Sequence, residues 1–279
     1  MKAVTLTELY QARAEQSDSA FRPAALALCN WFEELLGLLF PQRAVRSYRD
    51  AADVGEHAAD LRQRLGRLVD SAELAGQLMA RLPELHTALC EDASAIFEAD
   101  PAAGSPEEVI AVYNTFYAIA CYRVANALAV SGVKLLPRAL SEFAHARTGI
   151  DIHPEASIGR RFCIDHGTGV VIGQTTVIGA DVRIYQGVTL GGTSLHRPER
   201  PAKRHPTIED RVIIYANATV LGGDTVIGHD SVLGGSVWVT SSVPPHSKVV
   251  FEPVVRTSPR AGGKPLTCLR PSLTPRWST

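Results

Sequence analysis

The sequence predicts an α + β protein, in which an N-terminal α-helical domain precedes a left-handed parallel β-helix of hexapeptide repeats. In residues 1–148, apolar side chains recur at three- and four-residue spacing, as on one face of a helix. From about residue 150, short β-branched runs separated by glycine carry apolar residues at every sixth position. We therefore expect a helical domain at 1–148, a β-helix at 149–250 and a C-terminal tail at 251–279.

The helical half is identified by apolar spacing and divided by proline. Two runs have the helical spacing most clearly: Leu61, Leu65, Leu68 and Val69, and then Val109, Val112, Phe116 and Ile119. Pro41, Pro83, Pro101 and Pro137 interrupt the pattern, because proline cannot continue a helix. Ser105 followed by Pro106 has the form of a helix start. These breaks predict five or six helices.

The β-helix is predicted from three series of apolar residues in a register of six. They are Ile152, Ile158 and Ile164; Ile172, Ile178, Ile184 and Leu190; and Ile208 and Ile214, continued after a one-residue slip by Leu221, Ile227, Leu233 and Val239. Each should point into one interior column, and three hexapeptides make roughly one coil, so about five coils are expected. An irregularity at 166–169 separates the first two series. A β-sandwich is disfavoured, because its strands alternate with a period of two.

Two segments do not follow the repeat. Leu195–His205 is rich in basic residues and proline, so we expect the coil to expel it as a loop. The tail from Arg256 to Thr279 has no acidic residue and few large apolar ones, so we expect it to be largely disordered.

Composition excludes several classes of partner and site. With 28 Lys+Arg against 29 Asp+Glu, the chain has no basic field that would attract nucleic acid or an anionic membrane. The five cysteines have no CxxC spacing, which argues against a disulfide framework or a thiolate zinc site. No signal peptide and no apolar stretch long enough to span a bilayer is visible, so we expect a cytoplasmic protein.

Histidine is the side chain best suited to moving a proton near neutral pH, and three of the nine histidines lie at interruptions of the repeat: His153, His166 and His205. Asp151 and His166 are separated by slightly less than one coil of about 18 residues, so they can meet on adjacent rungs. The carboxylate would then orient the imidazole as a general base. Two alternatives are hydrogen bonding at a coil corner and a zinc ion held by three histidines between subunits.

The end of the expelled loop and one glycine segment are candidates for binding. Arg204 beside His205 offers a planar bidentate donor that suits a carboxylate, although a solvated basic loop would look the same. Gly191 and Gly192 lack the strand-to-helix turn of a phosphate-binding loop, yet their backbone amides could line a thioester site.

In combination, several motifs resemble those of bacterial serine O-acetyltransferases, which belong to the hexapeptide-repeat acyltransferases. The central motifs are TGIDIHP (148–154), DHGTGVVIG (165–173), QGVTLGGT (186–193) and KRHPTI (203–208). The likeness extends to Glu91–Asp92, Asp100–Pro101 and SVPPH (242–246), and it covers a little over half of the chain. Residues 1 to about 85 add no signature.

The resemblance implies an enzyme that uses acetyl-CoA as co-substrate and no metal, with trimers formed through catalytic β-helices and joined in pairs through oligomerising helical domains. The family's general base matches His166 and its supporting carboxylate matches Asp151. Its serine-holding residues match Asp100, Asp165, Arg204 and His205, in an active site between neighbouring β-helices. Its acetyl-CoA groove matches Gly191, Gly192, Ala216 and Gly235.

Three positions depart from the family pattern. Gln174 stands where the family commonly has glutamate, and Phe251-Glu252-Pro253 replaces a Gly-x-Pro turn. The family's cysteine-synthase partner recognises a C-terminal isoleucine, whereas this sequence ends Trp277-Ser278-Thr279, which speaks against that complex.

The sequence therefore predicts acetyl transfer from acetyl-CoA to the hydroxyl of L-serine, the first step of cysteine biosynthesis, by general-base catalysis without an acyl-enzyme. Acetylation of a related hydroxy amino acid such as homoserine remains open, because one methylene changes recognition by only about 1–3 kcal/mol. A non-catalytic β-helix scaffold is the alternative from a different class of protein.

Overall fold

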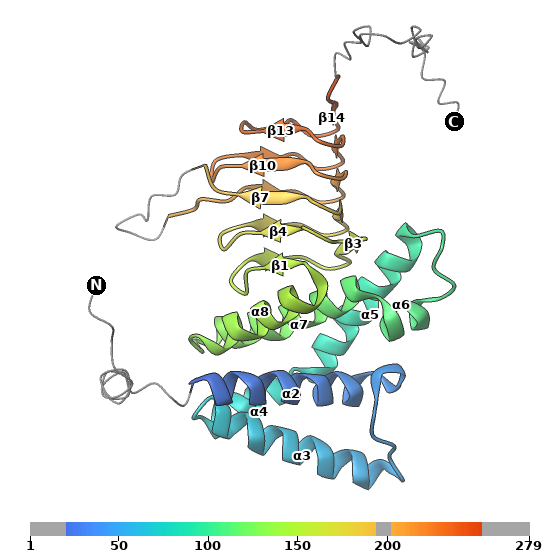
Figure 1. Ribbon diagram of the computed structural model, residues 1–279, viewed down its shortest axis with the longest axis vertical. Helices are drawn as coiled ribbons and strands as arrows, with labels where there is room; N and C mark the ends of the chain where they lie inside the picture. Colours follow the sequence, from blue (N-terminus) through green and yellow to red (C-terminus); the bar gives the residue numbers. More distant parts are fainter. Residues whose placement is uncertain (1–20, 194–201, 253–279) are drawn as a thin grey trace, which may run out of the picture.

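A computed structural model describes residues 21–193 and 202–252, with the side chains of 21–23 left out. The helices form two layers at one end of the molecule, and the β-helix stands on the layer formed by α5 to α8 (Figure 1). The predicted fold class, an N-terminal helical region followed by a parallel β-helix of hexapeptide repeats, is confirmed. Most of Leu195–His205 and the tail beyond Glu252 lie outside the described residues.

The described helical region ends two residues before the first strand. Its elements are α2 (Phe21–Leu39), the 3-10 helix η1 (Pro41–Arg43), α3 (Ala51–Leu68), α4 (Ala72–Ala80), α5 (Leu82–Ala99), α6 (Pro106–Val112), α7 (Asn114–Val130) and α8 (Leu136–Thr148). As predicted, Ser105 caps α6, accepting a hydrogen bond from the Glu108 amide, and prolines stand in the first turns of α5, α6 and α8.

The described residues contain seven α-helices, so the prediction of five or six was too low. Two of the breaks have no proline to mark them. Ser71 begins α4 by accepting a hydrogen bond from the Leu74 amide, and Tyr113 in extended conformation separates α6 from α7. Serine and tyrosine are weaker signals of a helix boundary than proline, because both also occur within helices.

A buried ion pair fastens the helices to the first rung of the β-helix. Asp92 of α5 is fully buried and pairs with Arg123 of α7. The Asp92 carboxylate also accepts a hydrogen bond from the Phe162 amide (2.9 Å), and Arg123 donates to the Gly159 carbonyl (2.9 Å). These bonds satisfy both charges, as burial requires, and fix α5 and α7 against the start of the β-helix.

Three parallel sheets, here named A, B and C, form the faces of the β-helix. Sheet A contains β1 (Asp151–Ile152), β4 (Val171–Ile172), β7 (Thr189–Gly191), β10 (Thr219–Leu221) and β13 (Trp238–Val239). Sheet B contains β2 (Ser157–Ile158), β5 (Val177–Ile178), β8 (Thr207–Ile208) and β11 (Val226–Ile227). Sheet C contains β3 (Cys163–Asp165), β6 (Arg183–Tyr185), β9 (Ile213–Ile214), β12 (Val232–Leu233) and β14 (Lys248–Val249).

The predicted interior column is correct except at one position. In sheet A, Leu190 pairs with Val220, which is fully buried, whereas Leu221 pairs with Gly191 and is half-buried. The interior residue of β10 is therefore Val220, and the prediction of Leu221 was wrong. The one-residue offset lies after the strand, where Gly222 turns the chain at φ +106°. Adjacent aliphatic residues at 220 and 221 hid this register in the sequence.

No helix in the described ranges is both long and apolar enough to cross a membrane.

Candidate active site

Two groups of polar residues lie at opposite corners of sheet A. The His166 group, at the corner between sheets C and A, consists of Asp100, Tyr113, Asp165 and His166. The Arg204 group, at the corner between sheets A and B, consists of His153, Gln174, Thr175, Arg204 and His205. In Figure 1 the elements that carry the first group, α6 and β3, lie on one side of the β-helix, and the second group lies at the opposite corner of sheet A, between its strands and those of sheet B.

Asp100 is held in place at the end of α5. Its carboxylate accepts hydrogen bonds from the Tyr113 hydroxyl (2.7 Å) and the Ala102 amide (2.8 Å). These two bonds, together with the nearby His166, lower the pKa of Asp100, so that this carboxyl group is an anion at neutral pH. The same hydrogen bond raises the pKa of Tyr113 to about 12. Asp100 can therefore receive a cationic group such as an ammonium.

His166 occupies the irregular turn that the sequence predicted. Its backbone is left-handed (φ +58°), its side chain is 73% exposed, and its Nε2 lies 3.9 Å from Asp165 Oδ1. Gly167 (φ +83°) follows, where a Cβ atom would come within 2.5 Å of Ile150. The glycine therefore lets the turn pack on the first rung, while His166 projects outward with its imidazole accessible.

Thr175 organises the Arg204 group. Its hydroxyl oxygen accepts hydrogen bonds from the amides of Arg204 (2.8 Å) and His205 (3.0 Å), and its own amide donates to His205 Nδ1 (3.1 Å). Nδ1 is therefore an acceptor, which places the proton of neutral His205 on Nε2. A Cβ atom on Gly173 would lie 2.0 Å from the His205 ring, so only glycine leaves room for this imidazole.

Gln174 links the Arg204 guanidinium to a carboxylate. Arg204 donates to Gln174 Oε1 (3.3 Å), and Gln174 Nε2 donates to Glu155 Oε2 (2.7 Å). The uncharged Gln174 side chain thus orients Arg204. The nearest negative charge in this chain of hydrogen bonds is on Glu155, which contacts Gln174. This is the structural consequence of glutamine at the position where the resemblance leads one to expect glutamate.

A cleft of about 370 Å³ lies beside the Arg204 group and is also lined by Arg138 and Asp151. Burial lowers the pKa of His153, and Arg138 lowers it further. Burial likewise lowers the pKa of His205, with Arg204 as the next cause. Both imidazoles are therefore predominantly neutral at pH 7.

Asp151 and His166 lie on adjacent rungs, as predicted, but do not touch within the described chain. The Asp151 amide donates to the Val170 carbonyl, in the segment that follows the His166 turn. The Asp151 carboxylate pairs with Arg138 (3.5 Å). The carboxylate beside His166 is instead that of Asp165, at 3.9 Å. Within one chain His153 lies by the cleft and His166 lies at the other corner, and the alternative of a zinc ion held by histidines between subunits stays a prediction.

The residues matched to the acetyl-CoA groove are divided between the same two corners. Gly191 ends β7, and Gly192 follows it at the A–B corner. Ala216 and Gly235 lie on successive rungs at the C–A corner, where the Ser236 amide donates to the Ala216 carbonyl (2.9 Å). Beside them Tyr185 and Tyr215 stack with ring centroids 4.9 Å apart.

Sequence reasoning missed three residues that position the candidate groups: Tyr113, Arg138 and Thr175. Neither the apolar register nor a recognised motif identifies these positions. Their partners lie in other elements or about 30 residues away in the chain, so packing alone reveals them.

Comparison with known proteins gives a consistent result. No protein-family model matches the chain. A plasmid-encoded serine acetyltransferase of Synechococcus elongatus is 48% identical over 179 residues, which are 62% of this chain and 56% of that protein. The Mycobacterium tuberculosis serine acetyltransferase is 47% identical over 180 residues, covering 63% of this chain and 76% of the relative.

Among solved structures, serine acetyltransferase isoform 3 of Entamoeba histolytica, in complex with cysteine, superposes with a TM-score of 0.74 at 34% identity. The match covers 82% of this chain and 84% of that one, and so includes helices as well as the β-helix. From this agreement in sequence and in fold, we conclude that the chain belongs to the serine acetyltransferase family.

Proposed function

We propose that the protein transfers the acetyl group of acetyl-CoA to the hydroxyl of L-serine, in a site completed between two copies of the chain. One observation carries the proposal: the His166 group and the Arg204 group lie at opposite corners of sheet A. Because the width of sheet A separates the two groups in one chain, we infer that a serine contacts both where the C–A corner of one copy meets the A–B corner of the next.

This arrangement favours a cyclic trimer with sheet A facing the symmetry axis. Each copy would offer one corner to each neighbour, which closes the ring. The outward face of sheet A carries exposed apolar side chains at Val171 and at Trp238, which is 70% exposed in the single chain. Such residues support contact with another copy. Two trimers joined through their helical regions would give the hexamer that the resemblance implies.

In the proposed mechanism His166 acts as general base. It removes the proton of the serine hydroxyl as the oxygen attacks the thioester carbonyl, and it returns the proton to the CoA thiolate as the C–S bond breaks. Asp151 would orient and stabilise the imidazolium by exchanging its contact with Arg138 for one with His166. This mechanism requires no cysteine nucleophile, and three of the four described cysteines are buried.

The charged residues would bind the two ends of serine. Arg204, oriented by Gln174, suits the carboxylate, because a guanidinium forms a bidentate pair with it. Asp100 and Asp165 suit the ammonium group, and neutral His205 can donate a hydrogen bond from Nε2. Acetyl-CoA would lie in the groove between copies, along Gly191 and Gly192 of one and Ala216 and Gly235 of the next.

The substrate is tested by measuring thiol release from acetyl-CoA with serine, homoserine and threonine. We expect serine to give the highest kcat/KM. A higher value with homoserine would show that the site serves the longer amino acid, and no release with any hydroxy amino acid would support a scaffold.

The shared site is tested by mixing two inactive chains, His166→Ala and Arg204→Ala. In a mixed trimer one boundary combines an intact His166 with an intact Arg204, so random assembly should restore roughly a quarter of wild-type activity. Native mass spectrometry would verify that mixed trimers form. Mixed trimers without restored activity would mean that the two groups do not act on one serine.

A further inference from the structure

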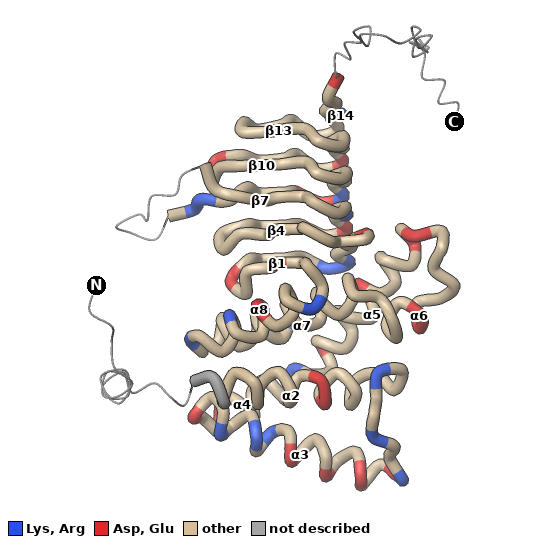
Figure 2. The backbone as a smooth tube through the Cα atoms, in the orientation of Figure 1, with Lys and Arg blue, Asp and Glu red and all other residues tan. Residues whose placement is uncertain are grey.

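A ladder of charged residues follows the corner between sheets B and C. Successive rungs place Arg161, Asp181, Arg211, Asp230 and His246 there, all in left-handed conformation at φ between 55° and 59°. Arg161 Nε lies 2.6 Å from Asp181 Oδ1, and Arg211 Nε lies 2.7 Å from Asp230 Oδ1. Figure 2 shows both signs of charge along the side of the β-helix that carries β3 and β14. Arginine and aspartate therefore alternate along the corner, and at the last position, where the alternation would place arginine, the chain has His246.

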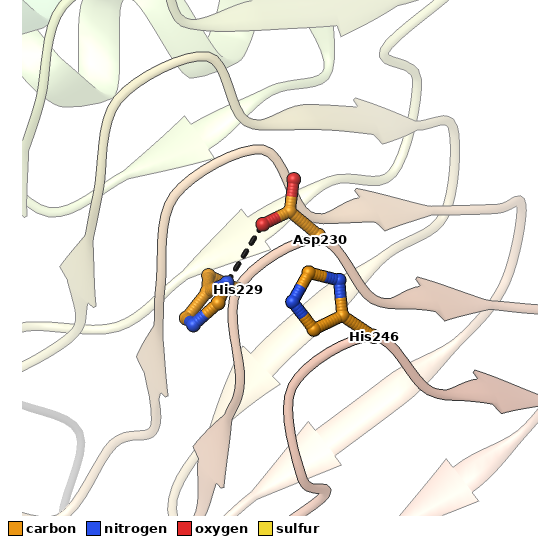
Figure 3. A group of neighbouring side chains, drawn as sticks. All are labelled: His229, Asp230 and His246. Carbon is orange, nitrogen blue, oxygen red and sulfur yellow. Dashed lines mark hydrogen bonds and ion pairs between the residues drawn. The ribbon is translucent and has the colours of Figure 1, made fainter.

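Two imidazoles and a carboxylate converge at this last step. His229 Nδ1 lies 2.7 Å from Asp230 Oδ2, and the His246 ring lies 4.9 Å from the His229 ring at an interplanar angle of 88°. One ligand atom from each residue can be chosen so that all three lie within 4.8 Å of one another. Figure 3 shows the three side chains gathered between two neighbouring turns of the chain.

We propose that His229, Asp230 and His246 form a binding site for one divalent transition-metal cation of the Zn²⁺ type. Two neutral imidazoles with one carboxylate are a ligand set that Zn²⁺ accepts, with bonds of about 2.0–2.2 Å. His229 Nδ1 and Asp230 Oδ2 are at hydrogen-bond distance, so a metal ion would replace that hydrogen bond after a small widening to the separation of about 3.3 Å between two ligands of tetrahedral Zn²⁺. His246 is exposed, so a side-chain rotation can bring its ring nitrogen closer.

The surroundings favour a cation at this place. The Asp230 carboxylate is held in one orientation by Arg211 and His229. Arg211 contacts both oxygens of that carboxylate, at 2.7 and 2.8 Å; Oδ1 keeps a second lone pair for another partner, and Oδ2 also contacts His229 Nδ1. The Glu209 carboxylate accepts a hydrogen bond from the His229 amide (2.8 Å), and Asp210 adds a further negative charge beside Arg211.

The site is separate from the proposed catalytic groups. The B–C corner lies opposite sheet A, so a trimer built around sheet A leaves it open to solvent. The ligands come from two successive turns, His229–Asp230 after β11 and His246 before β14. A bound ion would therefore tie the last rungs together, and its effect should appear in stability.

Zinc binding by the full chain, purified without a histidine tag, tests the proposal through equilibrium dialysis with metal analysis. We expect one Zn²⁺ per chain and a higher Tm when Zn²⁺ is added. His229→Gln and His246→Asn should each weaken binding about 10- to 100-fold or more and abolish the Tm increase. Asparagine is chosen at 246 because it tolerates the left-handed backbone there.

Two control variants separate this site from other histidines. His145→Gln alters an exposed histidine on α8, and His205→Asn alters the cleft; both should keep the wild-type zinc affinity. Less than one equivalent of Zn²⁺ on the wild type at micromolar free metal would overturn the proposal. So would unchanged affinity in His229→Gln and His246→Asn, or loss of binding in His205→Asn.

Discussion

The Tyr113 hydroxyl donates a 2.7 Å hydrogen bond to the Asp100 carboxylate. Because Asp100 caps the end of α5 and Tyr113 precedes α7, this bond joins the two helix ends. Asp100 is the predicted partner for the serine ammonium, whereas Tyr113 has no recognised role in the sequence. The tyrosine is therefore a positioning residue, which acts on substrate through Asp100.

Tyr113→Phe should raise the KM for serine about 5- to 10-fold and leave the KM for acetyl-CoA unchanged, because the lost hydrogen bond acts on serine only through Asp100 and so costs less than the roughly 1.5–3 kcal/mol of a direct hydrogen bond to a charged group. Steady-state kinetics with each substrate varied measures both. Tyr48→Phe is the matched control, since it removes a hydroxyl bonded to His57 in the helical region. An unchanged serine KM would show that Asp100 does not depend on Tyr113.

His166→Ala should lower kcat by roughly 10²- to 10⁴-fold with little change in acetyl-CoA affinity, as expected for loss of a general base. Asp151→Asn should lower kcat less, because the base is retained but its tautomer and imidazolium are less favoured. Single-turnover rates across pH measure both effects, with exposed His145→Ala as control. Near-normal kcat for His166→Ala at every pH would assign the base to another residue.

Arg204→Ala should chiefly raise the KM for serine, because it removes the bidentate partner of the carboxylate. Arg204→Lys should recover little, since one ammonium cannot replace the planar guanidinium that Gln174 orients. Arg81→Ala, which alters an exposed arginine between α4 and α5, is the control. Full recovery by lysine would mean that only the charge matters at this position.

Asp92→Asn should lower the free energy of unfolding by about 3–5 kcal/mol, because it leaves Arg123 buried beside a neutral group. Urea unfolding measures the loss. Replacing both residues by apolar ones of similar size should cost less than the single change. Glu91→Gln, in the neighbouring and exposed pair with Arg160, should cost no more than about 1 kcal/mol. An equal loss in the two single variants would contradict a special role for the buried pair.

The lowered pKa values of His153 and His205 predict loss of stability in acid. Below the ordinary histidine value of 6.5, the unfolded chain binds protons that the folded chain does not, so stability should fall as pH decreases through that range. The double variant His153→Gln/His205→Gln should lose less stability than wild type between about pH 7 and about pH 5.5 in urea unfolding. If the wild type and the double variant lost the same stability over this pH range, other residues would be responsible for the sensitivity to acid.

The sequence by itself determined the fold class, because each rung repeats the same local requirement for one interior aliphatic residue and one tight corner. It also located the irregular turn at His166, which breaks the register of six. The register failed at Val220 and Leu221, where two adjacent aliphatic residues satisfy the pattern equally and only strand pairing distinguishes them.

Only the tertiary structure decided how the candidate site residues are grouped. Asp100, Tyr113 and Asp165 come from separate elements, and their contacts depend on how the helices pack on the first rungs. Packing also placed His166 and Arg204 at opposite corners of sheet A, and brought His246 beside His229. Sequence spacing predicts neighbours along a repeat, but the direction of each side chain at a corner depends on backbone conformation and on partners distant in the chain.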